Sequence, residues 1–246
     1  MRRKLIAGNW KMYKNQAETK SFLEQVDNVV ATTVDAAIFC QAPLLSIFQA
    51  QAKKLKFGPQ SIYWEEKGAF TGELSPRLAS ELGCTFALAG HSERRQFFGE
   101  TNESAVKRAL AAHRFGMKAV FCLGESLVER ESSHTFQVLQ QQLEPLFRLS
   151  PKYPEDFCFA YEPVWAIGTG KNATAQQAQE VHNFLRQEIC KAWGSEVAAR
   201  CRMLYGGSVK AENARELMSQ ADIDGVLVGG ASLEAGSFLA IAAAAN

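Results

Sequence analysis

Short apolar segments recur along the whole chain and alternate with longer amphipathic ones. Most of the short segments have the length of a strand and lack strict apolar/polar alternation, which is typical of parallel strands buried on both faces. In chain order they read KLIAGNW, AAIFCQAP, LKFGPQ, FALAGHS, KAVFCLGE, FCFAYEPV, RMLYGGS and GVLVGGAS. The pattern therefore predicts eight parallel strands.

The segments between these strands show the spacing of helices. Thr174 and Gln177 predict a capping box at one helix start, and Gly194 predicts its end. Ser75 followed by Pro76 predicts another helix start, with proline in the first turn. The C-terminal LEAGSFLAIAAAAN predicts a final helix. In the helix that Thr174 caps, the apolar residues expected on one face are Ala178, Val181, Leu185, Ile189 and Ala192.

Eight strands alternating with helices over 246 residues, without a proline- or serine-rich linker, favour the α/β class. We predict one closed parallel (β/α)8 barrel that forms a single domain over residues 1–246. The alternative is an open, doubly wound sheet. That fold predicts a glycine fingerprint after the first strand, and GNWKMYK is not one.

Polar residues and glycines gather at the C-terminal ends of the predicted strands. In a closed parallel barrel these ends share one face, where barrel enzymes have their active sites. We therefore expect residues far apart in the sequence to converge there: Asn9, Lys11, His91, Glu93, Glu125, Glu162, Ser208, Gly229 and Gly230.

Glu162 ends an apolar strand and precedes the loop PVWAIGTGK. A carboxylate held against Val164 and Trp165 is suited to act as a general base, whereas a salt-bridged surface glutamate is the plainer alternative. The loop favours the base, because a stiff Pro163–Trp165 segment followed by a flexible AIGTG has the composition of a hinged lid.

His91 opens HSERRQFF, where a strand turns into a short helix. A helix N-terminus disfavours imidazolium, so we expect a neutral ring that donates a hydrogen bond to a developing oxyanion, although a lone histidine there can also be structural. Lys11 is either a solvated charge or a cation for an anionic substrate. No histidine or cysteine stands at ligand spacing from His91, so we expect no metal.

Paired glycines close the last two strands in YGGSV and LVGGAS. Each pair alone could simply form a tight turn, but both together favour a phosphate site at the place where barrels commonly have one. GTGK is not a nucleotide phosphate loop, because Trp165 and Asn172 stand where that motif requires glycine and serine or threonine. These features together suit proton abstraction next to the carbonyl of a small phosphorylated substrate.

Composition narrows the choice of partners. A net charge of +1 argues against bulk attraction to nucleic acid or an anionic membrane, and no segment is long enough to span a bilayer. The apolar stretch after MRRK is too short for a secretion signal. Six cysteines form no C-x-x-C pair, and Cys40, Cys122 and Cys158 lie in apolar strands, which predicts buried free thiols in a reduced, cytoplasmic protein.

A set of motifs in a fixed order resembles the triosephosphate isomerase family. The motifs are GNWKM (8–12), GAFTGE (68–73), GHSERR (90–95), CLGE (122–125), AYEPVWAIGTGK (160–171), YGGSV (205–209) and DGVLVGGASL (224–233). The resemblance implies a TIM barrel that interconverts dihydroxyacetone phosphate and D-glyceraldehyde 3-phosphate through an enediolate, without a cofactor, in glycolysis and gluconeogenesis.

The resemblance also implies residue roles. It makes Glu162 the base, His91 the electrophile, and Asn9 with Lys11 the substrate-binding pair. Glu93 would support the lysine, and Cys122 would be a structurally important buried thiol. Thr71 would reach into the neighbouring subunit of a homodimer. The phosphate-binding positions would be Gly168, Ser208, Gly229 and Gly230.

Two departures from the family pattern concern Tyr13, where asparagine is usual, and Asn172, at the second hinge of the loop. Both leave the chemistry intact and affect the expected subunit contact and lid. A barrel that binds sugar phosphates without catalysis is a second hypothesis, which the presence of Asn9, Lys11, His91 and Glu162 disfavours. A phosphosugar epimerase on the same barrel is a third, and it would typically require metal ligands at the strand ends.

Overall fold

The computed structural model describes residues 2–30, 33–154, 157–167 and 173–245. Its centre is a sheet of eight parallel strands in the order β3-β2-β1-β8-β7-β6-β5-β4. The strands are β1 (Leu5–Asn9), β2 (Asp35–Cys40), β3 (Lys56–Pro59), β4 (Phe86–Ala89), β5 (Lys118–Leu123), β6 (Cys158–Tyr161), β7 (Arg202–Tyr205) and β8 (Gly225–Val228).

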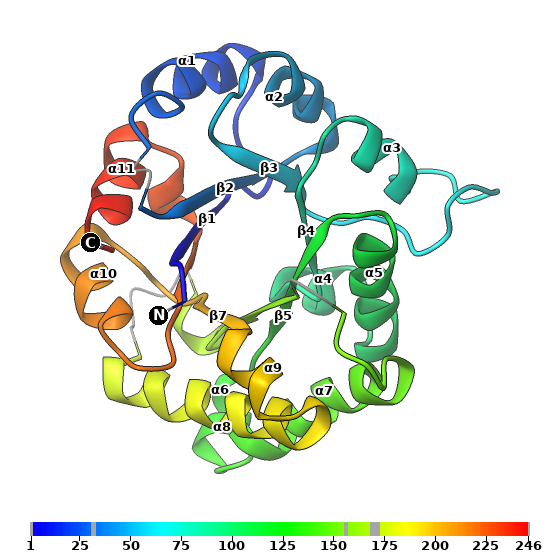
Figure 1. Ribbon diagram of the computed structural model, residues 1–246, viewed down its shortest axis with the longest axis vertical. Coiled ribbons are helices and arrows are strands. Elements are labelled where there is room, and N and C mark those ends of the chain that lie inside the picture. Colours follow the sequence, from blue (N-terminus) through cyan, green and yellow to red (C-terminus); the bar gives the residue numbers. More distant parts are fainter. Residues whose placement is uncertain (1, 31–32, 155–156, 168–172, 246) are drawn as a thin grey trace.

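The sheet curls into a barrel whose seam lies between β3 and β4 (Figure 1). At this seam the Thr85 N–H donates to the Phe57 carbonyl oxygen at 3.0 Å, and the Lys118 N–H donates to the Thr85 carbonyl oxygen at 2.9 Å. The main chain just before β4 thus joins β3 to β5. The closed α/β barrel predicted from the sequence is confirmed, and the open sheet is wrong.

Helices form the outer ring (Figure 1). They are α1 (Gln16–Val26), α2 (Leu45–Gln51), α3 (Pro76–Glu81), α4 (Ser92–Phe97), α5 (Asn102–Arg114), α6 (Leu127–Glu131), α7 (Thr135–Leu149), α8 (Ala175–Trp193), α9 (Ser195–Arg200), α10 (Ala211–Met218) and α11 (Ala235–Ala243). Short 3₁₀ turns are η1 (Ala42–Leu44), η2 (Val164–Ala166) and η3 (Gly230–Ser232).

The predicted helix ends are confirmed. Thr174 and Gln177 form a capping box at α8, which ends at Gly194 with a φ of 89°, and Ser75 caps α3 with Pro76 in its first turn. The apolar face of α8 is buried as predicted, except that Ala192, in the last turn, is exposed.

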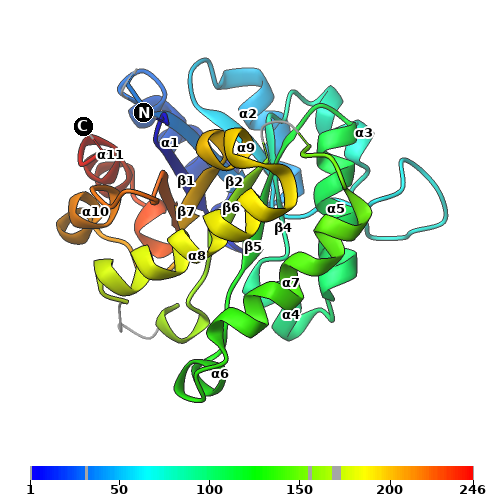
Figure 2. The same ribbon diagram turned by 60° about the horizontal axis from the view of Figure 1, so that its bottom comes forward.

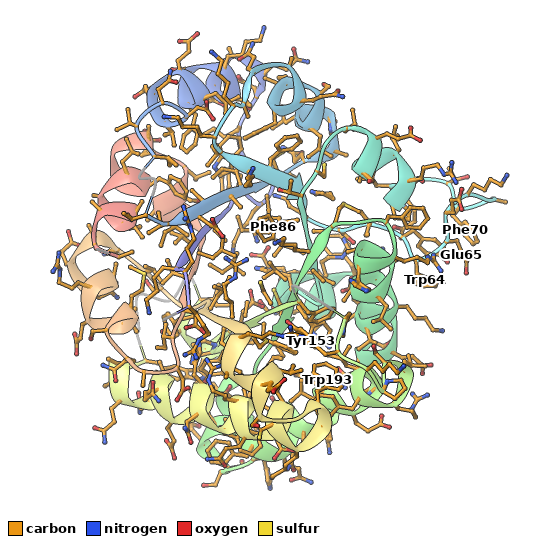
Figure 3. All side chains as sticks on the ribbon, viewed as in Figure 1. Trp64, Glu65, Phe70, Phe86, Tyr153 and Trp193 are labelled. Carbon is orange, nitrogen blue, oxygen red and sulfur yellow. The ribbon has the colours of Figure 1, made fainter. Side chains whose placement is uncertain are left out.

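Side chains alternate between the two faces of each strand. Leu5 and Ala7 point into the barrel, where they pack with residues such as Phe86, whereas Ile6 belongs to the core between the barrel and the helices (Figure 3). The same alternation directs Asn9, the last residue of β1, and Glu162, the residue after β6, inward at the C-terminal end of the barrel. The two-residue period of the strands therefore explains why both predicted site residues point into the mouth of the barrel.

The opposite end of the barrel carries paired charges. Asp224 accepts from Arg2 Nε at 2.6 Å and from Arg186 Nη2 at 3.0 Å, and its side chain is 3% exposed. Asp35 pairs in the same way with Arg3 and with Arg202. Figure 2 shows the N-terminus and α6, which follows the C-terminal end of β5, at opposite ends of the molecule.

Cys40, Cys122 and Cys158 are buried thiols that form no disulfide among the described residues, as predicted from their positions in apolar strands. Burial raises the pKa of the Cys122 thiol well above its ordinary value. Among the described residues, no helix combines the length and apolar character needed to cross a membrane.

Candidate active site

A cavity of about 220 Å³ opens at the C-terminal ends of the strands. Seven of the residues predicted to converge line it: Asn9, Lys11, His91, Glu162, Ser208, Gly229 and Gly230. The remaining lining residues are Ile167, Gly206, Gly207, Val209, Lys210, Leu227 and Ala231. The barrel thus brings the first strand, the fourth and the last three to one small space.

Glu162 follows β6 directly and is 1% exposed. Its main chain lies against the end of β5, where the Glu162 N–H donates to the Leu123 carbonyl oxygen at 2.8 Å. Two glycines make room for it. A Cβ atom on Gly124 would lie 1.7 Å from the Glu162 carbonyl oxygen, and one on Gly206 would lie 2.9 Å from Glu162 Cγ. The glycines after β5 and β7 therefore let this carboxylate enter the barrel mouth.

The Glu162 carboxylate is held by the start of α4. Its Oε1 lies 3.1 Å from His91 Nε2, and its Oε2 accepts from the Ser92 N–H at 2.9 Å. His91 caps α4, because its Nδ1 accepts from the Glu93 N–H at 3.3 Å. Since Nδ1 is an acceptor, the neutral ring carries its proton on Nε2, the atom that lies beside Glu162 Oε1. This agrees with the neutral imidazole expected at a helix N-terminus.

Lys11 adopts an unusual backbone conformation just beyond β1, with a φ of 51°. This left-handed region costs a lysine about 1 kcal/mol or more and persists only where neighbours hold it. The Lys11 N–H donates to Asn9 Oδ1 at 3.0 Å, and Nζ lies 2.5 Å from Glu93 Oε1. The structure thus joins Lys11 to the acid that the sequence paired with it.

The ends of β7 and β8 form the opposite wall of the cavity. Ser208 lies in the turn after β7, while Gly229 and Gly230 lie between β8 and the short turn η3. A Cβ atom on Gly229 would lie 3.5 Å from Lys11 Cε, so this wall faces the lysine stem. The two other predicted positions on the loop after β6, Gly168 and Asn172, lie outside the described residues.

Glu125 was expected at the site but does not line the cavity. Its Oε1 accepts from Tyr161 Oη and Trp165 Nε1, each at 3.0 Å, and lies 3.6 Å from Arg130 Nη1. Burial raises the pKa of Glu125, against the effect of these donors. Because Trp165 lies in η2, directly after Glu162 and Pro163, this acid anchors the segment that leaves the site.

Two other predicted residues also lie away from the cavity. Cys122 is in β5, inside the barrel, where its Sγ lies 3.9 Å from the Val120 carbonyl oxygen. Thr71 is exposed in the long connection between β3 and α3, which projects from the barrel (Figures 1 and 3). It cannot reach the cavity of its own chain.

The sequence reasoning missed Ser92 and Gln60. Ser92 contacts Glu162 through its main-chain N–H, and such a contact cannot be predicted from the identity of the side chain. Gln60 donates to Lys11 and Asn9, and its place as the last residue of LKFGPQ, at a strand end, could have identified it. Within the described ranges, no three histidine, cysteine or acidic side chains are grouped so as to hold a metal ion.

Comparison with known proteins identifies the family. The family model described as "Triosephosphate isomerase" matches residues 4–245. A triosephosphate isomerase from Moorella thermoacetica is 47% identical and one from Geobacter metallireducens is 46% identical, each over 98% of both chains. A third, from Fusobacterium nucleatum, is 43% identical over the full length of both chains. This chain, with its closed barrel and its acid–histidine–lysine cavity, belongs to the triosephosphate isomerase family.

Proposed function

We propose that Glu162, His91, Lys11 and Asn9 carry out the interconversion of dihydroxyacetone phosphate and D-glyceraldehyde 3-phosphate, the reaction of this family in glycolysis and gluconeogenesis. The observation that carries the proposal is the contact of His91 Nε2 with Glu162 Oε1 at 3.1 Å, because it places a proton donor and a proton acceptor side by side in one cavity. The site draws on strands from β1 to β8, which supports a single catalytic domain.

In this proposal Glu162 removes a proton from the carbon next to the carbonyl, and the electron pair moves to the carbonyl oxygen. His91 Nε2–H donates to that oxygen as its charge develops. The enediolate takes the proton back from Glu162 at the former carbonyl carbon. At the same time the hydroxyl on the first carbon gives up its proton, and the oxygen on the second carbon gains one, by exchange through His91 Nε2. The ketose thereby becomes the aldose, and no atom is gained or lost.

The acid and the base must part before they act. Glu162 Oε2 accepts from the Ser92 N–H and Oε1 lies against His91 Nε2, so the carboxylate cannot at the same time reach a substrate carbon. A substrate carbonyl that takes over the His91 proton frees Glu162 Oε1. The contact between the two side chains is therefore the resting arrangement, and the bound substrate takes the place of Glu162 beside His91 Nε2.

Lys11 and the glycine wall hold the two negative charges of the reaction. Lys11 Nζ balances the enediolate and the phosphate, which explains why the lysine stem lies beside Gly229. Ser208, Gly229 and Gly230 would receive the phosphate with main-chain N–H groups. Gly168 would join them from the loop after β6.

The test is a coupled assay with D-glyceraldehyde 3-phosphate, with and without a chelator. We expect activity that the chelator does not change, and a Glu162→Gln variant that binds substrate-like phosphates but turns over at least about a hundredfold more slowly. Parental turnover in that variant would move the base elsewhere, and an inactive parental protein that still binds the phosphates would favour the binding scaffold.

We also propose that two copies of the chain associate. Met12 is 86% and Phe98 68% exposed. Met12 lies after β1 and Phe98 after β4, at the same end of the barrel as the segment after β3 that contains Phe70 and Thr71. Such apolar side chains together favour an interface over a free surface. Sedimentation should give twice the 27.1 kDa of one chain, and Thr71→Arg should lower that mass and the activity together. A parental monomer with full activity would contradict the dimer.

A further inference from the structure

Gln60 connects the ends of three neighbouring strands. It follows the last residue of β3, and its half-buried side chain reaches the ends of β2 and β1. Its Nε2 donates to the Lys11 carbonyl oxygen at 2.7 Å, and to Asn9 Oδ1 and the Phe39 carbonyl oxygen at 3.3 Å each. Gln60 does not line the cavity, so any effect on the reaction must pass through these partners.

The first partner is the Asn9 side chain, which has one accepting and one donating end. Asn9 Oδ1 accepts from the Lys11 N–H at 3.0 Å as well as from Gln60. Oδ1 is therefore committed to the protein. Nδ2 has no hydrogen-bond partner in the part of the chain that the structure describes, and Asn9 lines the cavity. The amide is thus oriented so that its donor is available to a substrate oxygen.

The second partner is the peptide of Lys11. A φ of 51° is a conformation that a residue with a long side chain keeps only where its surroundings hold it. The Lys11 N–H is held by Asn9 Oδ1, and its carbonyl oxygen is held by Gln60. Because both sides of the residue are fixed, the direction in which the lysine stem leaves the backbone is fixed too.

We infer that Gln60 is a positioning residue for the isomerisation, which acts by orienting the Asn9 amide and the Lys11 backbone together. The inference rests on the roles proposed above for Asn9 and Lys11. Misplacing a reacting group by about 1 Å can lower a rate about a hundredfold. Gln60→Met keeps the length of the side chain and removes its donors, so we expect kcat/KM to fall between about ten- and a hundredfold.

Gln41→Met is the matched control. Gln41 Nε2 also donates to a main-chain carbonyl after β1, that of Tyr13, at 3.3 Å, but among the described residues it makes no hydrogen bond to Asn9 or Lys11. We expect this variant to melt slightly lower and to keep the parental kcat/KM. Equal melting shifts in the two variants, with parental kinetics in both, would show that Gln60 is only structural.

A Gln60→Glu variant gives a readout that loss of stability alone would not. Its carboxylate would face three oxygen atoms, those of Asn9, Lys11 and Phe39, and repulsion would favour the protonated form, whose O–H restores one donor. We expect kcat/KM, relative to the parental protein at the same pH, to be lowest at high pH and to recover as the pH falls. Circular dichroism at each pH checks that the variant stays folded, and a constant ratio in folded protein would contradict the inference.

A double variant separates this inference from the proposed function. If Gln60 acts through Asn9, the loss caused by Gln60→Met should shrink in an Asn9→Ala background. An equal loss in both backgrounds would overturn the inference while leaving the site intact. Parental activity in Asn9→Ala and in Lys11→Met would instead contradict the proposed roles of these residues, whatever Gln60 does.

Discussion

The two ends of the barrel use the same kinds of charged residue in opposite ways. At the N-terminal end, Asp224 and Asp35 each lie between two arginines, and every contact joins one part of the fold to another. At the C-terminal end, the charges of Glu162 and Lys11 also have partners, but both side chains line a cavity.

The comparison shows what distinguishes a structural charge from a catalytic one. It is not the presence of a partner, because both ends are paired. The difference is that the pairs at the C-terminal end border a cavity, so that a ligand there can take the place of one partner. Removing a charge should therefore affect mainly folding at one end and mainly turnover at the other.

Lys11→Met should give the largest effect. In the proposed mechanism the cation faces negative charge in the bound substrate and in the transition state, so we expect kcat/KM to fall about a hundred- to a thousandfold, ~3–4 kcal/mol. The melting temperature should change little, because methionine would have to adopt the same strained backbone conformation as lysine. If the protein loses stability and keeps its turnover, Lys11 belongs with the structural charges.

Asp224→Ala should do the reverse. It removes one carboxylate acceptor from each of two arginines, and the acceptor of the Met203 N–H, which donates to Asp224 Oδ2 at 3.1 Å. Breaking such a buried pair costs about 3 kcal/mol of unfolding free energy, measured by denaturant titration at fixed protein concentration. Turnover of the folded protein should be parental. Glu144→Ala, which removes an exposed pair with Arg148, is the control and should change stability by less than ~0.5 kcal/mol.

Trp165→Phe tests a residue that lies at the C-terminal end of the barrel but to which we assign a structural role. It removes the indole donor to the buried Glu125 and keeps an aromatic ring. Loss of one hydrogen bond to a charged acceptor should lower the unfolding free energy by about 1.5 kcal/mol. The accompanying fall in kcat/KM should be much smaller than that for Lys11→Met, and a fall of the same size would place Trp165 in the reaction itself.

Acid should produce the smallest of these effects, through Asp222 at the N-terminal end. Burial opposes its ionisation, but hydrogen bonds from Asn183, Gln179 and Arg186 outweigh this and hold its pKa below the ordinary value of 3.8. A lowered pKa gives stability that is present above the ordinary value and is lost as the pH falls through the lower one. Asp222→Asn should flatten that part of the stability profile, and an unchanged slope would exclude Asp222 as its source.

Much of this molecule follows from its sequence because strands and caps are local. The apolar segments gave the eight strands, and the positions of Asn9 and Glu162 at strand ends followed from the geometry of a parallel barrel. Glu125 could not be separated from them in the same way. It also follows a strand, and only the positions of Tyr161 and Trp165 decide that its carboxylate turns to β6 and η2. Ser92 escaped for a similar reason, because its contribution is a main-chain N–H.

The contact between His91 Nε2 and Glu162 Oε1 also has a consequence for selectivity. In the resting protein the two groups face each other, so an incoming molecule competes with an internal partner. Under the proposed function, a simple anion would bind at the glycine wall without separating that pair. Only a molecule that brings a carbonyl oxygen to the imidazole and an acidic carbon to the carboxylate replaces both halves of the lost interaction. Under the proposed function, phosphate alone would therefore bind without separating His91 from Glu162. Only a substrate that carries both a carbonyl oxygen and an acidic carbon would place the two groups in their reactive arrangement.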